Sequence, residues 1–251
     1  MRSRLIVAID GPAGAGKSTA ARLLAARLGY ALLDTGAIYR TMALRAWQRG
    51  IGWDDGPGVA ALADDLELAF RLDGQVNRVI ANGEDVTSSI RTPEISDGAS
   101  RVSALPAVRA ALLGLQRRIG APGGVVVEGR DIGTVVFPDA EAKFFLTASA
   151  DERARRRVAE LRAGGRPAEL AETKAEILAR DERDSNRAAA PLRRADDAVE
   201  IDSSAMGPDE VVTRMAEIVG SRVPGADPRP TGLNPGDFEG IDRVDIAGRQ
   251  R

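Results

Sequence analysis

The stretch that decides the fold is Ile9-Asp-Gly-Pro-Ala-Gly-Ala-Gly-Lys-Ser-Thr19. It follows the apolar run Leu5-Ile-Val-Ala-Ile9 and precedes a helical pattern, so it predicts a strand, a glycine loop and a helix in succession. The glycines, the lysine and the serine within Gly11–Ser18 have the spacing of a phosphate-binding loop, or P-loop. Such a loop turns backbone N–H groups toward a phosphate, and the following helix directs the positive end of its dipole at the same anion.

The two residues that close this loop carry its chemistry. Lys17 supplies positive charge to the outer phosphates, and the Ser18 hydroxyl can ligate Mg²⁺. Lysine occurs at only two other positions, Lys143 and Lys174, so composition alone does not account for a lysine at this position of the motif. A structural turn that only resembles the motif is the alternative, but the strand and helix on either side favour a nucleoside triphosphate site.

Composition excludes several kinds of chemistry. The chain of 251 residues contains neither cysteine nor histidine. Disulfides, thiolate nucleophiles, imidazole bases and His-ligated metals are therefore excluded. A net charge of −2 gives no global positive field for nucleic acid. Carboxylates, arginines, hydroxyls and a hard cation remain, and phosphoryl transfer can use all of them.

The apolar segments are short. Only five apolar residues separate Arg4 from Asp10, too few for the core of a signal peptide, and no apolar run approaches the length of a membrane span. We expect a cytoplasmic protein with no membrane partner.

Strands and helices alternate along most of the chain. Further short strands are predicted at residues 30–33, 123–128, 142–146 and 198–202, with helical patterns between them, including one over 94–119 interrupted at Pro106. This alternation predicts an α/β fold, a central parallel sheet with helices on both faces. Ser149-Ala-Asp-Glu152 predicts a capping box that opens an arginine-rich helix.

Residues 66–92 have a different character. Alternating segments surround Asp73-Gly74 and Asn82-Gly83, which are strong hairpin signals. We expect a small β-rich insertion in the α/β domain. Residues 223–251 are rich in Gly, Pro, Asp and Arg without a period and predict a flexible C-terminal tail.

Two polar segments follow predicted strands, where ligands bind in open α/β sheets. Asp34-Thr-Gly-Ala-Ile-Tyr-Arg40 offers an acid, a hydroxyl and a guanidinium, and Glu128-Gly-Arg-Asp131 offers an arginine beside an aspartate. Each pair is compatible with ligand binding or with a structural salt bridge. Glu128 is a candidate for the water shell of Mg²⁺, and a solvated carboxylate at a strand end is the alternative.

A third segment is Arg180-Asp-Glu-Arg-Asp-Ser-Asn-Arg187. On a helix Arg180, Arg183 and Arg187 would share one face, with Asp184 beside Arg180. Two interpretations are open for this segment. It is either a solvated helix with surface ion pairs, or a lid whose arginines close over the phosphates during transfer.

Taken together, these segments resemble the bacterial cytidylate kinases, a family in the nucleoside monophosphate kinase group of P-loop proteins. The resemblance runs in order from about residue 4 to residue 221. It rests on Ile9–Ser18, Leu33–Arg40, Asn82–Val86, Ile90–Glu94, Gly129–Pro138 and Arg180–Arg187. The P-loop is generic, whereas Asp-Thr-Gly-Ala-Ile-Tyr-Arg and Gly-Arg-Asp-Ile-Gly-Thr are far more specific. Family members often have Ser at the position of Thr35, and the tail has no counterpart.

The resemblance implies an enzyme that phosphorylates CMP and dCMP from ATP with Mg²⁺. We expect a monomer without a nucleic acid partner. The resemblance further implies a three-layer P-loop fold in one kinase domain, residues 1–222. The core would comprise residues 1–62, 94–149 and 191–222, a CMP-binding insertion residues 63–93, and a helical lid residues 150–190.

The resemblance also implies roles for individual residues. ATP would be bound by Gly11, Pro12, Ala13, Gly14, Ala15, Gly16, Lys17, Ser18 and Thr19. CMP would be surrounded by Thr35, Arg40, Ser100, Arg109, Arg130, Asp131, Asp184 and Arg187. The catalytic residues would be Lys17, Arg130, Arg180 and Arg187. Among the residues around CMP, Ser100 and Asp131 would recognise the cytosine edge with help from Arg109. Asp184 would bind the sugar. The monophosphate would be bound by Arg40, Arg130 and Arg187.

Two other functions stay open on the residues alone. One is a kinase of a different small acceptor, such as UMP, AMP or shikimate. The other is a nucleotide-dependent switch or RNA-binding module that uses the arginine-rich segment. No guanine-reading Asn-Lys-x-Asp sequence occurs in the chain, and the mild overall charge argues against RNA binding.

Overall fold

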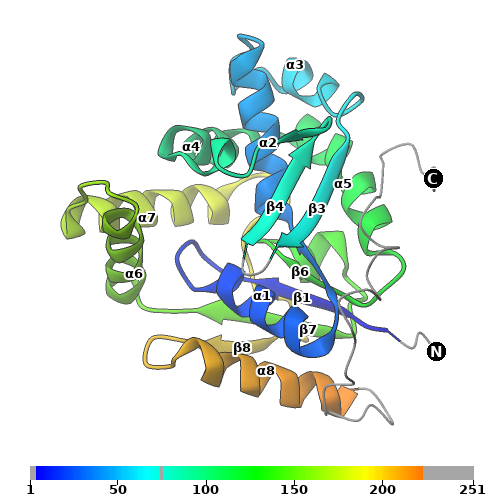
Figure 1. The fold of residues 1–251 in the computed structure, drawn as a ribbon, viewed down its shortest axis with the longest axis vertical. Helices are drawn as coiled ribbons and strands as arrows, with labels where there is room; N and C mark the ends of the chain where they lie inside the picture. The colour runs from blue at the N-terminus through cyan, green and yellow to red at the C-terminus, as the bar shows by residue number, and fades with distance from the viewer. Residues whose placement is uncertain (1–3, 74–75, 223–251) are drawn as a thin grey trace.

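The computed structural model describes residues 4–73 and 76–222, and its centre is a parallel sheet (Figure 1). The strands lie in the order β2-β6-β1-β7-β8, and every neighbouring pair is parallel. Their bounds are Ile6–Asp10 for β1, Ala31–Asp34 for β2, Val125–Glu128 for β6, Ala142–Thr147 for β7 and Val199–Asp202 for β8. The central strands are buried along their whole length, which explains their continuous apolar runs.

Helices cover both faces of this sheet. On one face α1 (Lys17–Leu28) and α8 (Pro208–Arg222) bury Val7 and Ile9 of β1. On the other, α2 (Thr35–Gln48), α4 (Pro93–Val102) and α5 (Pro106–Gly120) bury Ile6 and Ala8. The three-layer α/β fold is therefore confirmed, and the strands of the sheet lie within one residue or two of their predicted bounds.

The break expected at Pro106 separates two helices. α4 ends at Val102, and Pro106 is the first residue of α5, where its missing N–H costs no helical hydrogen bond. The remaining short elements are α3 (Gly56–Ala61), the 3₁₀ turn η1 (Ser89–Arg91) and the π-helical turn η2 (Ile132–Val136).

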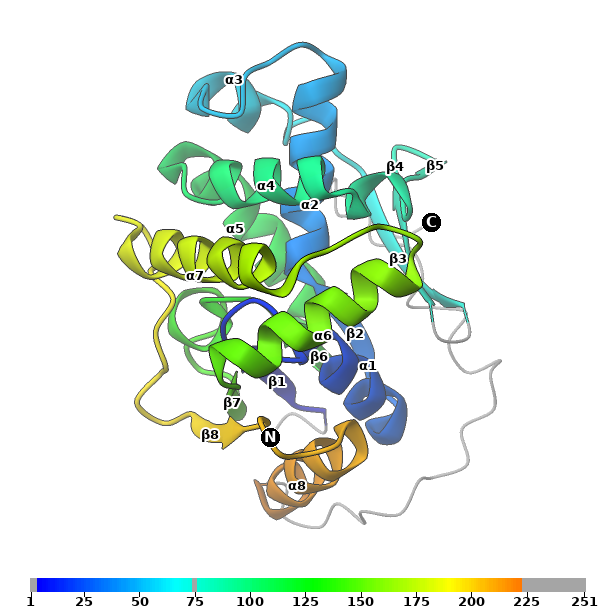
Figure 2. The same cartoon turned by 90° about the vertical axis from the view of Figure 1, so that its left-hand side faces the viewer.

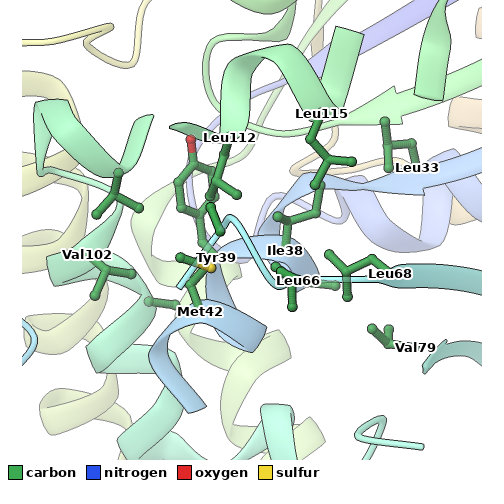
Figure 3. Close-up of a cluster of buried hydrophobic side chains, with 14 of the residues drawn as sticks. Leu33, Ile38, Tyr39, Met42, Leu66, Leu68, Val79, Val102, Leu112 and Leu115 are labelled. Atoms are coloured by element: carbon green, nitrogen blue, oxygen red, sulfur yellow. The ribbon is translucent and has the colours of Figure 1, made fainter. Parts of the chain in front are cut away.

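The expected β-rich insertion is an antiparallel sheet of β3 (Leu68–Asp73), β4 (Val76–Ala81) and β5 (Glu84–Asp85). Residues 74 and 75 of its first turn lie outside the described residues. The insertion has no core of its own, because Leu66, Leu68 and Val79 pack with Ile38 and Met42 of α2 in one cluster (Figure 3). It is an extension of the main core.

The arginine-rich segment forms two packed helices, α6 (Ala150–Ala163) and α7 (Leu170–Asn186), beside the carboxyl end of the sheet (Figure 2). The predicted capping box at Ser149 is only half formed. The Ser149 hydroxyl accepts from the Glu152 backbone N–H, but the Ser149 N–H donates to Ser204 instead of to Glu152. The Glu152 carboxylate instead pairs with Arg155 and Arg156 on its own helix.

In the part of the chain that the structure describes, no helix combines the length and the apolar character that crossing a membrane requires. The expected tail, residues 223–251, lies outside the described residues.

Candidate active site

Three strands end side by side at the edge of the sheet where the site lies. Glu128, the last residue of β6, pairs in register with Ile9 of β1 and with Asp34 of β2. The P-loop, the start of α2 and the Gly129–Asp131 turn therefore leave the sheet at adjacent points. Two of the sequence-predicted segments thus lie beside the P-loop.

The P-loop needs glycine for both conformation and space. Gly11 has φ +145°, and a Cβ there would overlap the carbonyl oxygen of Leu146 on β7. Gly14 and Gly16 also have positive φ, and Gly16 is the residue that precedes α1. This geometry turns the loop from β1 directly into the N-terminus of α1, the arrangement expected of an anion cradle.

Lys17 and Ser18 begin α1 at the bottom of this cradle. The Lys17 ammonium donates to the Pro12 carbonyl over 2.7 Å. Burial, followed by the charges of Arg130 and Arg180, lowers the pKa of Lys17 well below its usual value. An anion placed between these cations would relieve their repulsion.

Glu128 faces the P-loop serine. The Ser18 hydroxyl donates to the Glu128 carboxylate over 2.9 Å, and burial together with the charge of Asp34 raises the pKa of Glu128 to about 7. Among the described residues no cluster of three or more acidic side chains could cage a metal. One hydroxyl and one carboxylate fit Mg²⁺, which keeps much of its water and binds through substrate phosphates.

The start of α2 joins two of the three strand ends. The Asp34 side chain accepts from the Ala37 N–H, which caps α2, and pairs with Arg40 over 2.7 Å. The buried Thr35 hydroxyl donates to the Glu128 carbonyl over 2.7 Å. Asp34 therefore caps the N-terminus of α2 and also fixes the position of the Arg40 guanidinium.

A buried cluster of charges surrounds Asp131. Its carboxylate accepts from Arg109 of α5 and, over 3.0 Å, from Arg187 after α7. The Arg109 guanidinium also lies over the ring of Tyr39, 5.7 Å from its centre. Two segments that lie far from Asp131 in sequence therefore meet at its carboxylate.

A second pair lies next to this cluster. Arg130 donates to Asp184 over 3.0 Å. Burial alone would raise the pKa of Asp184, but Arg130, Arg180 and Arg187 together lower it. Burial and the charge of Arg130 lower the pKa of Arg180 to about 10.

Four buried polar atoms have no hydrogen-bond partner within the described residues: Arg40 Nε, Ser100 Oγ, Thr134 Oγ1 and Arg180 Nε. Buried polar groups are normally paired, so such atoms are candidates for contact with a ligand. The sequence places Arg40, Ser100 and Arg180 around the acceptor or the transferring group, whereas it assigned no role to Thr134.

The arginines of α7 do not share one face as the sequence predicted. Arg180 is partly buried and its Nε atom is fully buried, whereas the Arg183 side chain is about half exposed and pairs with Asp97 of α4. Arg187 lies beyond the last turn of α7 in an extended conformation, because the helix ends at Asn186. The nearness of Asp184 to Arg180 is confirmed by its effect on the pKa of Arg180.

Sequence reasoning missed three residues at the site. Asp10 accepts from the Ile132 and Gly133 N–H groups over 2.8 and 2.7 Å and so ties the end of β1 to the turn after β6. Arg153 and Asp181 contact the P-loop from α6 and α7. The position of Asp10 at a strand end was a usable signal, whereas nothing in the charge pattern distinguishes Arg153 or Asp181 from their neighbours.

The fold and this edge of the sheet define a P-loop nucleotide-binding protein with a cluster of arginines and aspartates beside the P-loop. A family model described as cytidylate kinase matches residues 7–221. The cytidylate kinase of Geobacter sulfurreducens is 57% identical over 228 residues, which cover 90% of this chain and 98% of that protein. The cytidylate kinase of Syntrophotalea carbinolica is 54% identical over 233 residues, 92% of this chain and 99% of that protein. The chain belongs to the cytidylate kinase family, and the enzymatic class that the sequence predicted is confirmed.

Proposed function

We propose that this enzyme transfers the γ-phosphoryl group of ATP to CMP and dCMP. Membership of the cytidylate kinase family supports this reaction. One structural observation supports our assignment of the active site. The P-loop lysine Lys17 lies near Arg130 and Arg180, Arg180 lies near Arg40, and the Nε atoms of Arg40 and Arg180 are buried and unpaired. That arrangement suits two phosphorylated ligands that meet end to end.

In the proposed reaction an oxygen of the CMP phosphate attacks the γ-phosphorus in line. A new P–O bond forms as the bond to the β,γ-bridging oxygen breaks, and ADP leaves with the electron pair. No general base is needed, because the attacking phosphate is already anionic. The protein contributes position and charge, which dominate phosphoryl transfer.

On the donor side, residues 11–19 hold the phosphates of ATP, with Lys17 at the outer ones. Mg²⁺ would neutralise phosphate charge beside Ser18, with Glu128 holding its water shell. Arg180 and Arg187 lie at the end of the lid segment, so their charges can reach the transferring group once both substrates are bound.

On the acceptor side, Ser100 and Asp131 contact the cytosine edge. Asp131 already accepts from Arg109 and Arg187, but a carboxylate has about four acceptor positions, which leaves room for an exocyclic amine. Asp184 binds the sugar and Thr35 lines the pocket, while Arg40, Arg130 and Arg187 bind the monophosphate. None of these residues lies in the insertion, residues 63–93, so its contribution to CMP binding would be indirect.

The test is ADP formation with MgATP and, in parallel, CMP, dCMP, UMP and AMP. CMP and dCMP should be the preferred acceptors, and faster turnover of UMP or AMP would refute the proposal. Without Mg²⁺ the rate should fall to background. We also propose that the protein acts in the cytoplasm as a monomer, which size-exclusion chromatography with light scattering checks for the oligomeric state.

A further inference from the structure

Two residues of the lid helices hold the P-loop from outside the nucleotide cradle. Arg153 on α6 has a buried guanidinium that donates to the Ala13 carbonyl over 3.0 Å and to the Ala148 carbonyl over 3.0 Å. The Cβ position of Gly14 would lie 3.1 Å from the Cβ of Arg153, so the loop and α6 are in close contact.

Asp181 on α7 completes this contact. One carboxylate oxygen accepts from the Ala13 N–H at 3.3 Å, and the other pairs with Arg153 at 2.5 Å. The N–H and the carbonyl of Ala13 are thus held by one acid–arginine pair contributed by two helices. We call Asp181, Arg153 and the two Ala13 groups the P-loop clamp.

The clamp is not required to hold the two lid helices together. Lys174 of α7 pairs with Asp151 of α6 over 2.7 Å on the exposed side, and Thr173 and Ile177 are buried. The Lys174–Asp151 ion pair joins only the two helices, whereas Asp181 and Arg153 also bind the backbone of the P-loop. A side chain that fixes a loop peptide fixes the directions of the neighbouring N–H groups as well.

Asp181 is also the neighbour of Arg180 on a rigid helix. A contact between Asp181 and the P-loop therefore sets the distance between the phosphate cradle and the Arg180 guanidinium. Small errors in the placement of such charges have large effects on rate, because transition-state stabilisation depends on preorganised geometry.

We propose that Asp181 and Arg153 are positioning residues for phosphoryl transfer, which bring the lid arginines to the P-loop through the peptide groups of Ala13. The proposal rests on the kinase function proposed above. Since neither residue need touch a substrate, the clamp should affect turnover more than the binding of CMP.

The test compares Asp181→Ala, Arg153→Ala and the double variant with Lys174→Gln, which breaks the exposed ion pair between the same helices. Each clamp variant should lower kcat about ten- to a hundredfold, the range for losing a hydrogen bond to a charged group. The KM for CMP should stay within about twofold, because no acceptor contact is removed. The double variant should resemble each single one, since the residues act as a unit.

Amide hydrogen exchange at Ala13, followed by NMR without substrates, gives a readout besides activity. Exchange should be about tenfold faster in Asp181→Ala than in wild type, and unchanged in Lys174→Gln. If Asp181→Ala does not fold, the isosteric Asp181→Asn replaces it with the same expected directions.

A kcat of Asp181→Ala equal to that of Lys174→Gln, or unchanged Ala13 exchange, would overturn the proposal. Additive losses in the double variant would overturn it too. A wild-type enzyme without CMP-dependent ADP formation would refute the proposed function instead, and Ala13 exchange would still test the clamp.

Discussion

At the scale of single residues, Arg180 and Arg183 provide a matched comparison on one helix. Arg180 is partly buried near Lys17 and Arg130, with its Nε buried and unpaired, whereas Arg183 forms an exposed pair with Asp97. Arg180→Ala should lower kcat about 10²–10³-fold, because the charge proposed to stabilise the transferring group is lost. Steady-state ADP formation measures the effect.

The same variant should leave stability nearly unchanged. Removing a partly buried arginine that its neighbours repel costs little, and we expect the free energy of unfolding to change by less than about 1 kcal/mol. Arg183→Ala is the control, and its kcat should stay within about twofold of wild type because surface pairs contribute little. Equal losses of activity in both variants would contradict the assignment of Arg180.

Asp10 gives a prediction about pH. Burial raises the pKa of Asp10 from 3.8 to about 6, partly offset by the N–H groups of Gly133 and Ile132. A raised pKa means that the folded state binds the proton more tightly than the unfolded state, so this contribution is fully present below pH 3.8 and is lost as the pH rises through about 6. Asp10→Asn removes this titration and one of the two accepted hydrogen bonds.

The measurement is the free energy of unfolding in urea for wild type and Asp10→Asn. The difference, wild type minus variant, should fall by about 2 kcal/mol between pH 4 and pH 7, because most of the titration between the unfolded and the folded pKa takes place in this range. A difference that stays constant with pH would show that Asp10 has its ordinary pKa.

At the scale of elements, the turn from β1 into α1 depends on a glycine that sequence spacing identified. A side chain at Gly11 would overlap the backbone of β7, and its φ of +145° strains any other residue. Gly11→Ala should destabilise the protein by roughly 3 kcal/mol or more, because backbone of the central sheet would have to move. Thermal or urea unfolding checks this.

Gly220 in α8 supplies the opposite case. Nothing lies within 4 Å of its Cβ position, so alanine fits and improves helix propensity. Gly220→Ala should stabilise the protein by up to about 1 kcal/mol. Destabilisation of similar size in both variants would mean that the packing around Gly11 is not what makes glycine necessary there.

The elements themselves could be predicted because their signals are local. Apolar runs such as Val125–Glu128 identified the buried strands, and Pro106 marked a helix start. The capping box failed for a non-local reason, since Ser204, 55 positions away, takes the Ser149 N–H. The shared face of Arg180, Arg183 and Arg187 failed because α7 ends before Arg187. Helix period predicts neighbours only while the helix continues.

At the scale of the whole molecule, the sequence supplied candidate site residues but not how they pair. The sheet order brings three strand ends together, and this follows from topology that no single segment encodes. The pairing of Asp131 with both Arg109 and Arg187, which lie 22 and 56 positions away, needs the complete fold. The clamp by Arg153 and Asp181 was missed for the same reason. Their charges look like those of any solvated helix until the P-loop is placed beside them.

Ligand binding at the proposed ATP site and at the proposed CMP site should have separate effects on the free energy of unfolding. A ligand that binds only the folded state raises the free energy of unfolding, by about 2.7 kcal/mol at a hundred times its dissociation constant. For a domain of this size that corresponds to a rise of roughly 5–10 °C in Tm. ADP and CMP, each added alone, should both produce such a rise in wild type.

Lys17→Ala should abolish the rise with ADP, because the lysine is proposed to hold the outer phosphates. Ser100→Ala should leave the ADP effect intact, since Ser100 lies on α4, outside the P-loop. Its unpaired hydroxyl is expected to bind CMP, so its loss should weaken CMP about fivefold and reduce the CMP-induced rise by about 1 kcal/mol. Differential scanning fluorimetry at fixed ligand concentrations measures all four combinations. If Ser100→Ala reduces both rises equally, the serine supports the fold as a whole. If it changes neither, the cytosine edge lies elsewhere and the acceptor site must be reassigned.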